Sequence, residues 1–303
     1  MKWESILVYM VALMASPLLI GIINRTKALF AGRQGPPLLQ LYHDLAKLLR
    51  NGAVYSRTTT WVFRAGPIIS LGAALFALTL IPLGGVPALF SFNCDFLLIA
   101  YLLGVMRFFT VAAAMDTGSS FEGMGSSREV QFSALAEPAL VLGLVAVVRA
   151  TGKLSLTCAL GAVSTDLWIE AGTALALVLM AWFAVFLAEN SRLPVDDPNT
   201  HLELTMVHEV MILDHGGPDL AFILYGAVLK LWILGAFVVG LLAPVRSGNL
   251  LLDMAAGLAG MVTLAVAVGV VESTMARLRL VRVPLLLLAA SAFSILAILL
   301  MMR

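Results

Sequence analysis

Long apolar segments alternate with short polar ones along this chain of 303 residues. A helix needs roughly 20 apolar residues to cross a bilayer, and runs near that length lie at residues 5–24, 62–82, 95–115, 130–149, 168–188, 219–243, 250–272 and 283–302. The pattern predicts eight membrane-spanning helices and leaves no segment for a separate soluble domain. We therefore expect an all-α integral membrane protein with a single transmembrane domain over residues 1–303.

The segment between the first two predicted spans has a different pattern. Apolar residues from Leu38 to Leu49 recur at spacings of three and four, while His43, Asp44 and Lys47 take the other face. This period predicts an amphipathic helix that lies along the membrane surface. Such a helix serves either as an interfacial anchor or as a docking ledge for a cytoplasmic partner.

Composition agrees with a membrane protein, since 61% of the residues are hydrophobic and 12% are charged. The basic residues also predict the orientation, because Lys and Arg in short loops stay in the cytoplasm. Loops after odd-numbered spans hold twelve of the nineteen, against five on the other side and two inside spans. We expect the main polar loops on the cytoplasmic side of a prokaryotic inner membrane.

The segment Glu189–Asp219 is the most polar part of the chain, with seven carboxylates and three histidines. Buried unpaired charge is costly near lipid, so this density indicates proton handling or partner docking. His201, His208 and His215 repeat every seven residues and would line one side of a continuous helix. A metal site with Glu203 or Glu209 is conceivable, but Gly216 indicates an interrupted helix, so proton relay or simple hydrogen bonding fits better.

Three charged residues fall inside predicted spans: Arg107, Glu137 and Lys230. A charge at that depth is functional by default, and we expect the two bases to neutralise buried acids or to face a polar cavity. Glu189 and Arg192, three residues apart, would share a helix face. They are either part of a proton path or an interfacial ion pair. Glu272, close to Arg277 and Arg279, is most simply a charged cap at a helix end.

Cysteine usage points away from a redox centre in this chain. Cys94 and Cys158 stand alone, with no second Cys or His at ligand spacing. We expect no cofactor, no metal site and no catalytic residue here, and no nucleic-acid partner.

Four segments resemble a known family. Arg25–Arg50, with its basic residues and Gly-Pro, is similar to the first loop of the membrane subunit that anchors the peripheral arm in respiratory complex I. Met115–Val130 (MDTGSSFEGMGSSREV) resembles the hydrogenase branch, the formate hydrogenlyase subunit 4 type of membrane-bound group 4 [NiFe] hydrogenase. Glu189–Leu204 and Val271–Leu280 resemble two further family motifs. In the third segment Val195, Asp197 and His201 depart from the family pattern, which puts the details of partner contact and of a quinone chamber in doubt.

The resemblance implies a non-catalytic coupling subunit of an oxidoreductase complex. It would link electron transfer in a peripheral arm to proton or sodium translocation. Expected partners are hydrogenase-like large and small subunits, an Fe–S subunit, antiporter-like membrane subunits and membrane lipids. The Fe–S clusters and the NiFe site would lie in those partner subunits.

The resemblance and the buried charges together give two sets of candidate residues. The proposed ion path contains Glu137, Glu189, Asp196, Glu203, Arg107 and Lys230. The proposed docking set contains Arg25, Arg33, Arg50, Asp116, Arg128, Glu129 and Arg192.

Two other functions stay open. The nearer one is a quinone-chamber subunit of a complex I NADH:quinone oxidoreductase. The farther one is a stand-alone secondary transporter, for which we would expect internal inverted repeats or paired broken spans. Neither feature is visible in the sequence.

Overall fold

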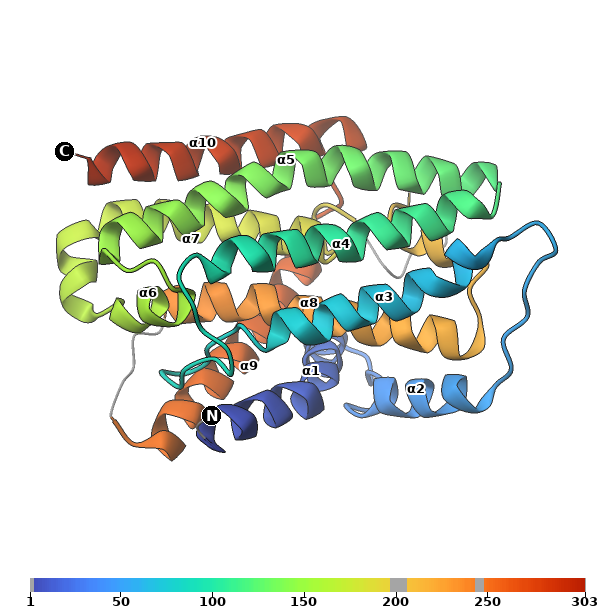
Figure 1. Ribbon diagram of the computed structural model, residues 1–303, viewed down its shortest axis with the longest axis horizontal. Coiled ribbons are helices and arrows are strands. Elements are labelled where there is room, and N and C mark those ends of the chain that lie inside the picture. The colour runs from blue at the N-terminus through green and yellow to red at the C-terminus, as the bar shows by residue number, and fades with distance from the viewer. Residues whose placement is uncertain (1–2, 197–205, 243–247, 303) are drawn as a thin grey trace.

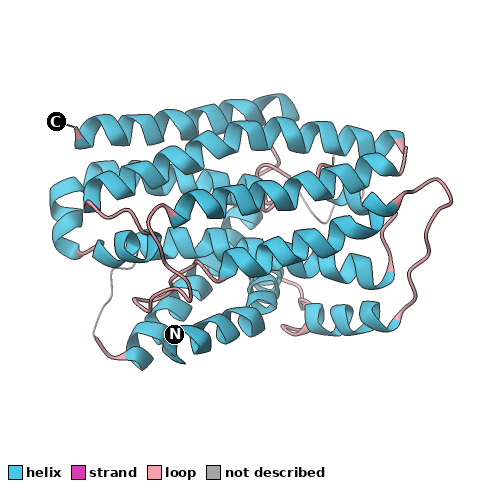
Figure 2. Ribbon diagram, viewed as in Figure 1, coloured by secondary structure: helices cyan, strands magenta, loops and turns pink. Residues whose placement is uncertain are grey.

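The computed structural model describes residues 3–196, 206–242 and 248–302. Eight of its helices are long and apolar enough to cross a membrane (Figures 1 and 2). They are α1 (Trp3–Phe30), α3 (Trp61–Leu78), α4 (Asp95–Asp116), α5 (Ser120–Thr151), α7 (Thr165–Glu189), α8 (Gly217–Leu242), α9 (Leu250–Thr274) and α10 (Val283–Met301). Helices satisfy their own backbone hydrogen bonds, which is why apolar runs of this length fold this way in lipid. The predicted all-α membrane architecture and its eight spans are confirmed.

Four shorter helices connect the spans. The predicted amphipathic helix is α2 (Gln40–Arg50), which lies against α1 and α8 and has no fully buried residue. Its place along the membrane surface stays a prediction. The apolar pattern did not predict α6 (Leu156–Ala162) or the 3₁₀ turns η1 (Glu209–Ile212) and η2 (Leu280–Arg282).

Helix α8 is the centre of the bundle. It contacts α1, α2, α3, α7 and α9 and is the most buried of the spans. Its Trp232 and Phe237 are almost fully buried, and Phe237 packs against Trp182 of α7, with 5.7 Å between the ring centroids. The indole Nε1 of Trp182 donates to the carbonyl oxygen of Leu140 in α5 at 3.3 Å. These contacts tie the polar helices described below to one core.

The polar connections gather at one end of the bundle, which we call the polar end. The segment from α1 to α3, the α4–α5 turn, the segment from α7 to α8 and the α9–α10 connection all lie there, the first two at the right in Figure 1. This arrangement puts the sequence's predicted cytoplasmic loops together.

Aromatic contacts fasten the loop before α3 to the start of α8. The ring of His215 stacks on Phe63 at 3.9 Å, and Tyr55 meets Phe63 edge to face. The guanidinium of Arg64 lies 4.3 Å above the Tyr55 ring. Burial and a hydrogen bond to Asp219 raise the pKa of Tyr55, while burial lowers the pKa of His215. His215 is therefore neutral at pH 7 and acts here as an aromatic packing element.

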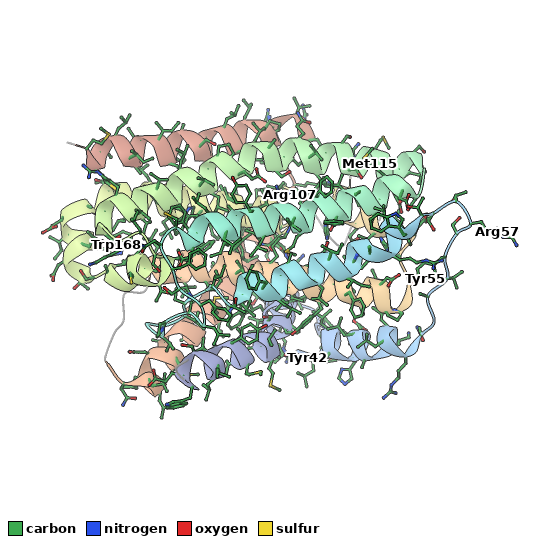
Figure 3. The ribbon with its side chains drawn as sticks, in the orientation of Figure 1. Tyr42, Tyr55, Arg57, Arg107, Met115 and Trp168 are labelled. Atoms are coloured by element: carbon green, nitrogen blue, oxygen red, sulfur yellow. The ribbon has the colours of Figure 1, made fainter. Side chains whose placement is uncertain are left out.

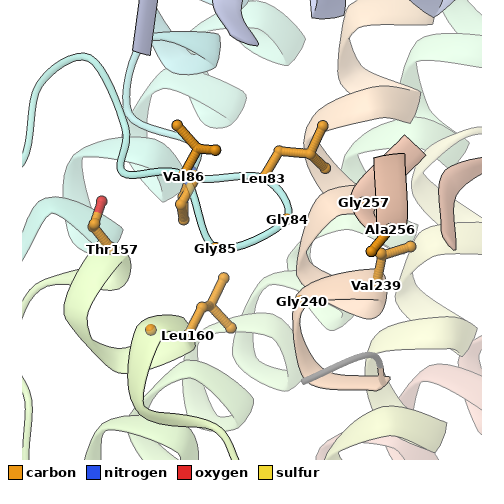
Figure 4. A pocket seen from close by; sticks show the side chains of 12 residues that line it. Leu83, Gly84, Gly85, Val86, Thr157, Leu160, Val239, Gly240, Ala256 and Gly257 are labelled. Atoms are coloured by element: carbon orange, nitrogen blue, oxygen red, sulfur yellow. The ribbon is translucent and has the colours of Figure 1, made fainter. Parts of the chain in front are cut away.

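The opposite end closes on a glycine turn. The turn Leu83–Val86 lies against α8 and α9 over a cavity of about 40 Å³ lined also by Thr157 and Leu160 (Figure 4). Gly84 has φ +56°, and a Cβ there would lie 2.1 Å from the carbonyl oxygen of Asp253. Only glycine fits this close approach.

Candidate functional site

Arg107 joins two acidic residues from different helices. It lies near the midpoint of α4, well away from both ends of the bundle (Figure 3). One terminal nitrogen donates to Oε1 of Glu137 in α5, and the other lies 2.7 Å from Oε1 of Glu189 in α7. Arg107 therefore bridges two carboxylates, as expected for a base that neutralises buried acids.

Lys230 completes the group from the central helix. Its Nζ lies 3.7 Å from Oε2 of Glu189, so that carboxylate has a base on each oxygen. The side chains of Arg107 and Lys230 are each 12% exposed, and that of Glu189 is 7% exposed. Glu137, Arg107, Glu189 and Lys230 form one set of linked ion pairs, which we call the central network.

Glu189 reaches the central network because α7 ends inside the bundle. It is the last residue of α7, yet it meets α4 and α8 near their midpoints. The chain after it is irregular up to η1. Irregular backbone is tolerated at membrane depth where it is buried in protein or lines a polar cavity, so the acidic segment enters the bundle instead of lying above it.

A small polar cavity adjoins the central network. It measures about 30 Å³, which exceeds the space that one water molecule needs. Its polar lining comes from Ser70, Arg107, Thr110, Glu129, His208 and Lys230. The hydroxyl of Ser70 lies 3.2 Å from that of Thr110. The cavity therefore brings hydroxyls, an imidazole, a carboxyl and two bases together around room for water.

Glu129 and His208 are the residues that sequence patterns did not place at this site. We predicted Glu129 as a docking residue, but the structure puts it in the cavity, within electrostatic range of Lys230, Arg107 and Glu189. Burial and the nearby Lys230 lower the pKa of His208 to about 4, so its imidazole is neutral at pH 7. A neutral imidazole both donates and accepts a hydrogen bond. The only sequence signal for these residues was their place in polar segments beside spans.

The central network and its cavity carry more acid than base. Three carboxyl groups, of Glu129, Glu137 and Glu189, face the two bases Arg107 and Lys230. An uncompensated charge is costly at this depth. Neutrality therefore requires one further cation, which is either a proton on a carboxyl or a bound metal cation such as Na⁺.

Glu137 marks where the central network reaches the surface of the chain. It lies near the midpoint of α5, and its side chain is 49% exposed although one oxygen binds Arg107. We expected an acid enclosed within the bundle, and the structure corrects this. A half-exposed carboxylate at this depth is too costly to face lipid tails.

A second buried cluster lies at the polar end. Glu272, at the end of α9, receives Lys27 of α1 at 2.9 Å and Arg192 at 3.4 Å, and its side chain is fully buried. This corrects two expectations. Arg192 binds Glu272 instead of its sequence neighbour Glu189, and Glu272 joins three segments instead of simply capping its own helix.

Asp196 belongs to a third pair. Its Oδ1 lies 2.7 Å from Arg277, and its Oδ2 accepts the amide of Val207 at 3.0 Å. Asp196 therefore lies outside the central network, although it is near enough to act electrostatically on Glu129. Glu203 and His201 lie outside the described residues.

The docking set divides into exposed and internal residues. Arg25, Arg33 and Arg50 are exposed on the polar end. Asp116 instead receives the amides of Thr60 and Phe63 and so holds the start of α3. Arg128 donates to the carbonyl oxygen of Met206, and Arg192, 6% exposed, is buried. Only the first three remain free to meet a partner by position.

The histidine repeat does not form a ladder. His208 precedes η1, and His215 lies in the turn between η1 and α8, so no continuous helix joins them. Within the described ranges 3–196, 206–242 and 248–302, no group of three His, Cys, Asp or Glu residues is arranged to hold a metal ion.

Comparison with known proteins places this architecture. Residues 4–302 match the family described as "NADHdh: NADH dehydrogenase". The chain belongs to the NADH dehydrogenase family. It is 31% identical to "Formate hydrogenlyase subunit 4" of Escherichia coli K12, over 93% of this chain and 92% of the relative. It is 29% identical to "Hydrogenase-4 component C" of the same organism, over 88% and 85%.

More distant relatives agree with this membership. The chain is 26% identical to an NADH-quinone oxidoreductase subunit of Anaplasma phagocytophilum, over 77% of this family member and 74% of the relative. A chain in the structure of the membrane-bound sulfane sulfur reductase, an archaeal respiratory membrane complex, shares the fold with a TM-score of 0.81 and 20% identity over 99% and 98%. The resemblance inferred from the four sequence segments is confirmed.

Proposed function

We propose that this chain is the membrane-anchoring and coupling subunit of a multisubunit redox complex of the membrane-bound [NiFe] hydrogenase or formate hydrogenlyase type. The names of the two Escherichia coli relatives support the hydrogenase branch. In this proposal the chain catalyses no bond change. It holds a peripheral arm at the polar end, in the cytoplasm, and links electron transfer there to proton or sodium movement. The Fe–S clusters and NiFe site belong to the hydrogenase-like large and small subunits and the Fe–S subunit.

The observation that carries the coupling role is the acid excess of the central network. Glu189 and Lys230 lie beside the polar cavity, and Arg107 links them to Glu137 on the outer face of α5. A cation that neutralises this set can enter from the cavity and leave at Glu137. Because Glu137 is half exposed at membrane depth, an antiporter-like membrane subunit is the partner that we propose to cover it.

The direct test removes the shared carboxylate. We expect Glu189→Gln to lower ion translocation per turnover by roughly tenfold or more, as for loss of a proton-carrying side chain, while the complex still assembles. Glu170→Gln is the matched control, because Glu170 lies on the same helix, is exposed, and is remote from the central network. Purified complexes in vesicles give both rates. Unchanged translocation in Glu189→Gln would remove the coupling role.

The same purification decides between partners. A nickel-site large subunit together with antiporter-like chains supports the hydrogenase type. Quinone-reductase chains without nickel ligands, together with quinone-dependent turnover, support the complex I alternative suggested by the more distant relatives. A chain that purifies alone and transports an ion supports the stand-alone transporter.

A further inference from the structure

An open cavity lies beside the Glu272 cluster at the polar end. It measures about 540 Å³ and lies between the last turns of α1 and α9 and the segment that follows α1. Its charged lining consists of Lys27, Arg33 and Glu272, and its neutral polar lining includes the amides of Asn24 and Gln34. It is separate from the cavity of the central network.

The charges around this cavity are unbalanced toward the base. Lys27 and Arg192 both face the single carboxylate of Glu272, whose side chain is fully buried. Arg33 adds a third base, is exposed, and makes no side-chain hydrogen bond or ion pair within the described part of the chain. Three bases against one acid leave two positive charges, which an anion would compensate.

The position of the cavity selects the kind of anion. Helix α1 has 28 residues and is about 42 Å long at 1.5 Å per residue, so its last turn extends beyond a hydrocarbon layer of about 30 Å. Leu29 and Phe30, which are 74% and 58% exposed, lie in that same turn, and Phe30 lines the cavity. Exposed apolar side chains beside a basic pocket at this depth match a lipid, with its acyl chains beside its charged head.

We propose that this cavity binds the headgroup phosphate of an anionic phospholipid of the inner leaflet. Arg33 donates to the phosphate through its planar fork, the Asn24 and Gln34 amides add neutral donors, and Lys27 contributes charge. Glu272 holds Lys27 in place and is not a ligand. This inference does not depend on the proposed coupling role, because it concerns anchoring of the α1 end.

Native mass spectrometry of the purified complex tests the site. The complex is taken from bilayer discs that contain equal amounts of phosphatidylglycerol and phosphatidylcholine. We expect wild type to retain phosphatidylglycerol preferentially. Arg33→Gln should lower that retention roughly tenfold, the loss expected for a charge-assisted hydrogen bond. Arg33→Lys should keep part of it. Arg50→Gln is the matched control, because Arg50 is exposed on α2 and does not line the cavity.

Three results would overturn the proposal. The first is equal retention of the two lipids by wild type, which needs no variant to fold. The second is the displacement of phosphatidylglycerol by millimolar inorganic phosphate, which would identify a site for free phosphate. The third is loss of a peripheral subunit in Arg33→Gln with lipid retention unchanged, which would identify a protein partner instead.

Discussion

The central network and the Glu272 cluster are both buried sets of ion pairs, but their charge excess has opposite sign. Three carboxyls face Arg107 and Lys230 in the first, whereas Lys27 and Arg192 face one carboxylate in the second. In a medium of low dielectric constant, an excess of acid is relieved by taking up a cation, and an excess of base by an anion. The comparison separates a set that can carry a proton from one that fastens α1, α9 and the segment after α7.

The largest effect on stability should come from Glu272→Gln. The substitution leaves Lys27 and Arg192 facing a neutral amide, and breaking a buried pair costs about 3 kcal/mol or more. Thermal unfolding in detergent should therefore start at a markedly lower temperature than for Glu170→Gln. Complexes assembled at low temperature should translocate ions normally per turnover, and a loss of coupling there would erase the contrast between the two regions.

His208 should make the stability of the central region depend on pH. Its pKa is lowered by burial to about 4, below the ordinary value near 6.5, so the folded chain resists protonation that the unfolded chain accepts. Its stabilising effect is full above pH 6.5 and is lost as pH falls toward 4, by roughly 2 kcal/mol between about pH 7.5 and about pH 5. His208→Gln removes this dependence.

The measurement for His208 is the difference between wild-type and His208→Gln unfolding temperatures across that pH window. His43→Gln is the control, because His43 is exposed on α2. A difference that does not change with pH would mean that His208 is not held neutral by its surroundings.

A smaller effect is expected for Glu137→Gln. Arg107 keeps Glu189 as a partner, and Glu137 is half exposed, so stability and assembly should change little. Translocation per turnover in vesicles should fall several-fold, a change near 1.4 kcal/mol for a factor of ten. Full translocation at normal turnover would place the outlet elsewhere.

The smallest effect should come from Arg277→Gln. Asp196 loses one base but still accepts the amide of Val207, and Arg277 is 20% exposed, so unfolding should become easier by only about 1 kcal/mol. Coupling should be unchanged, because this pair lies outside the central network. A coupling defect as large as that of Glu189→Gln would bring Asp196 back into the ion path.

Several parts of the candidate site could be predicted from the sequence. Arg107, Glu137 and Lys230 stood out because charge is rare inside apolar runs, and the structure links all three through Glu189. The expected partner of Glu189 was wrong, because helical spacing suggested Arg192. Spacing describes one helix, whereas Arg192 follows the end of α7 and turns toward α9. Glu129 was missed for a related reason, since its place in a polar segment did not show that it faces a cavity.

The sequence by itself determined the membrane class, the spans and the family, because these depend on apolar length and on ordered local motifs that any homologous chain would share. Only the tertiary structure decided which charges meet. Glu189 pairs with residues 82 and 41 positions away, Arg107 and Lys230, because α7 ends inside the bundle beside the midpoints of α4 and α8. Electrostatic partners in a low-dielectric interior depend on distance in space, which the packing of helices fixes and sequence spacing does not.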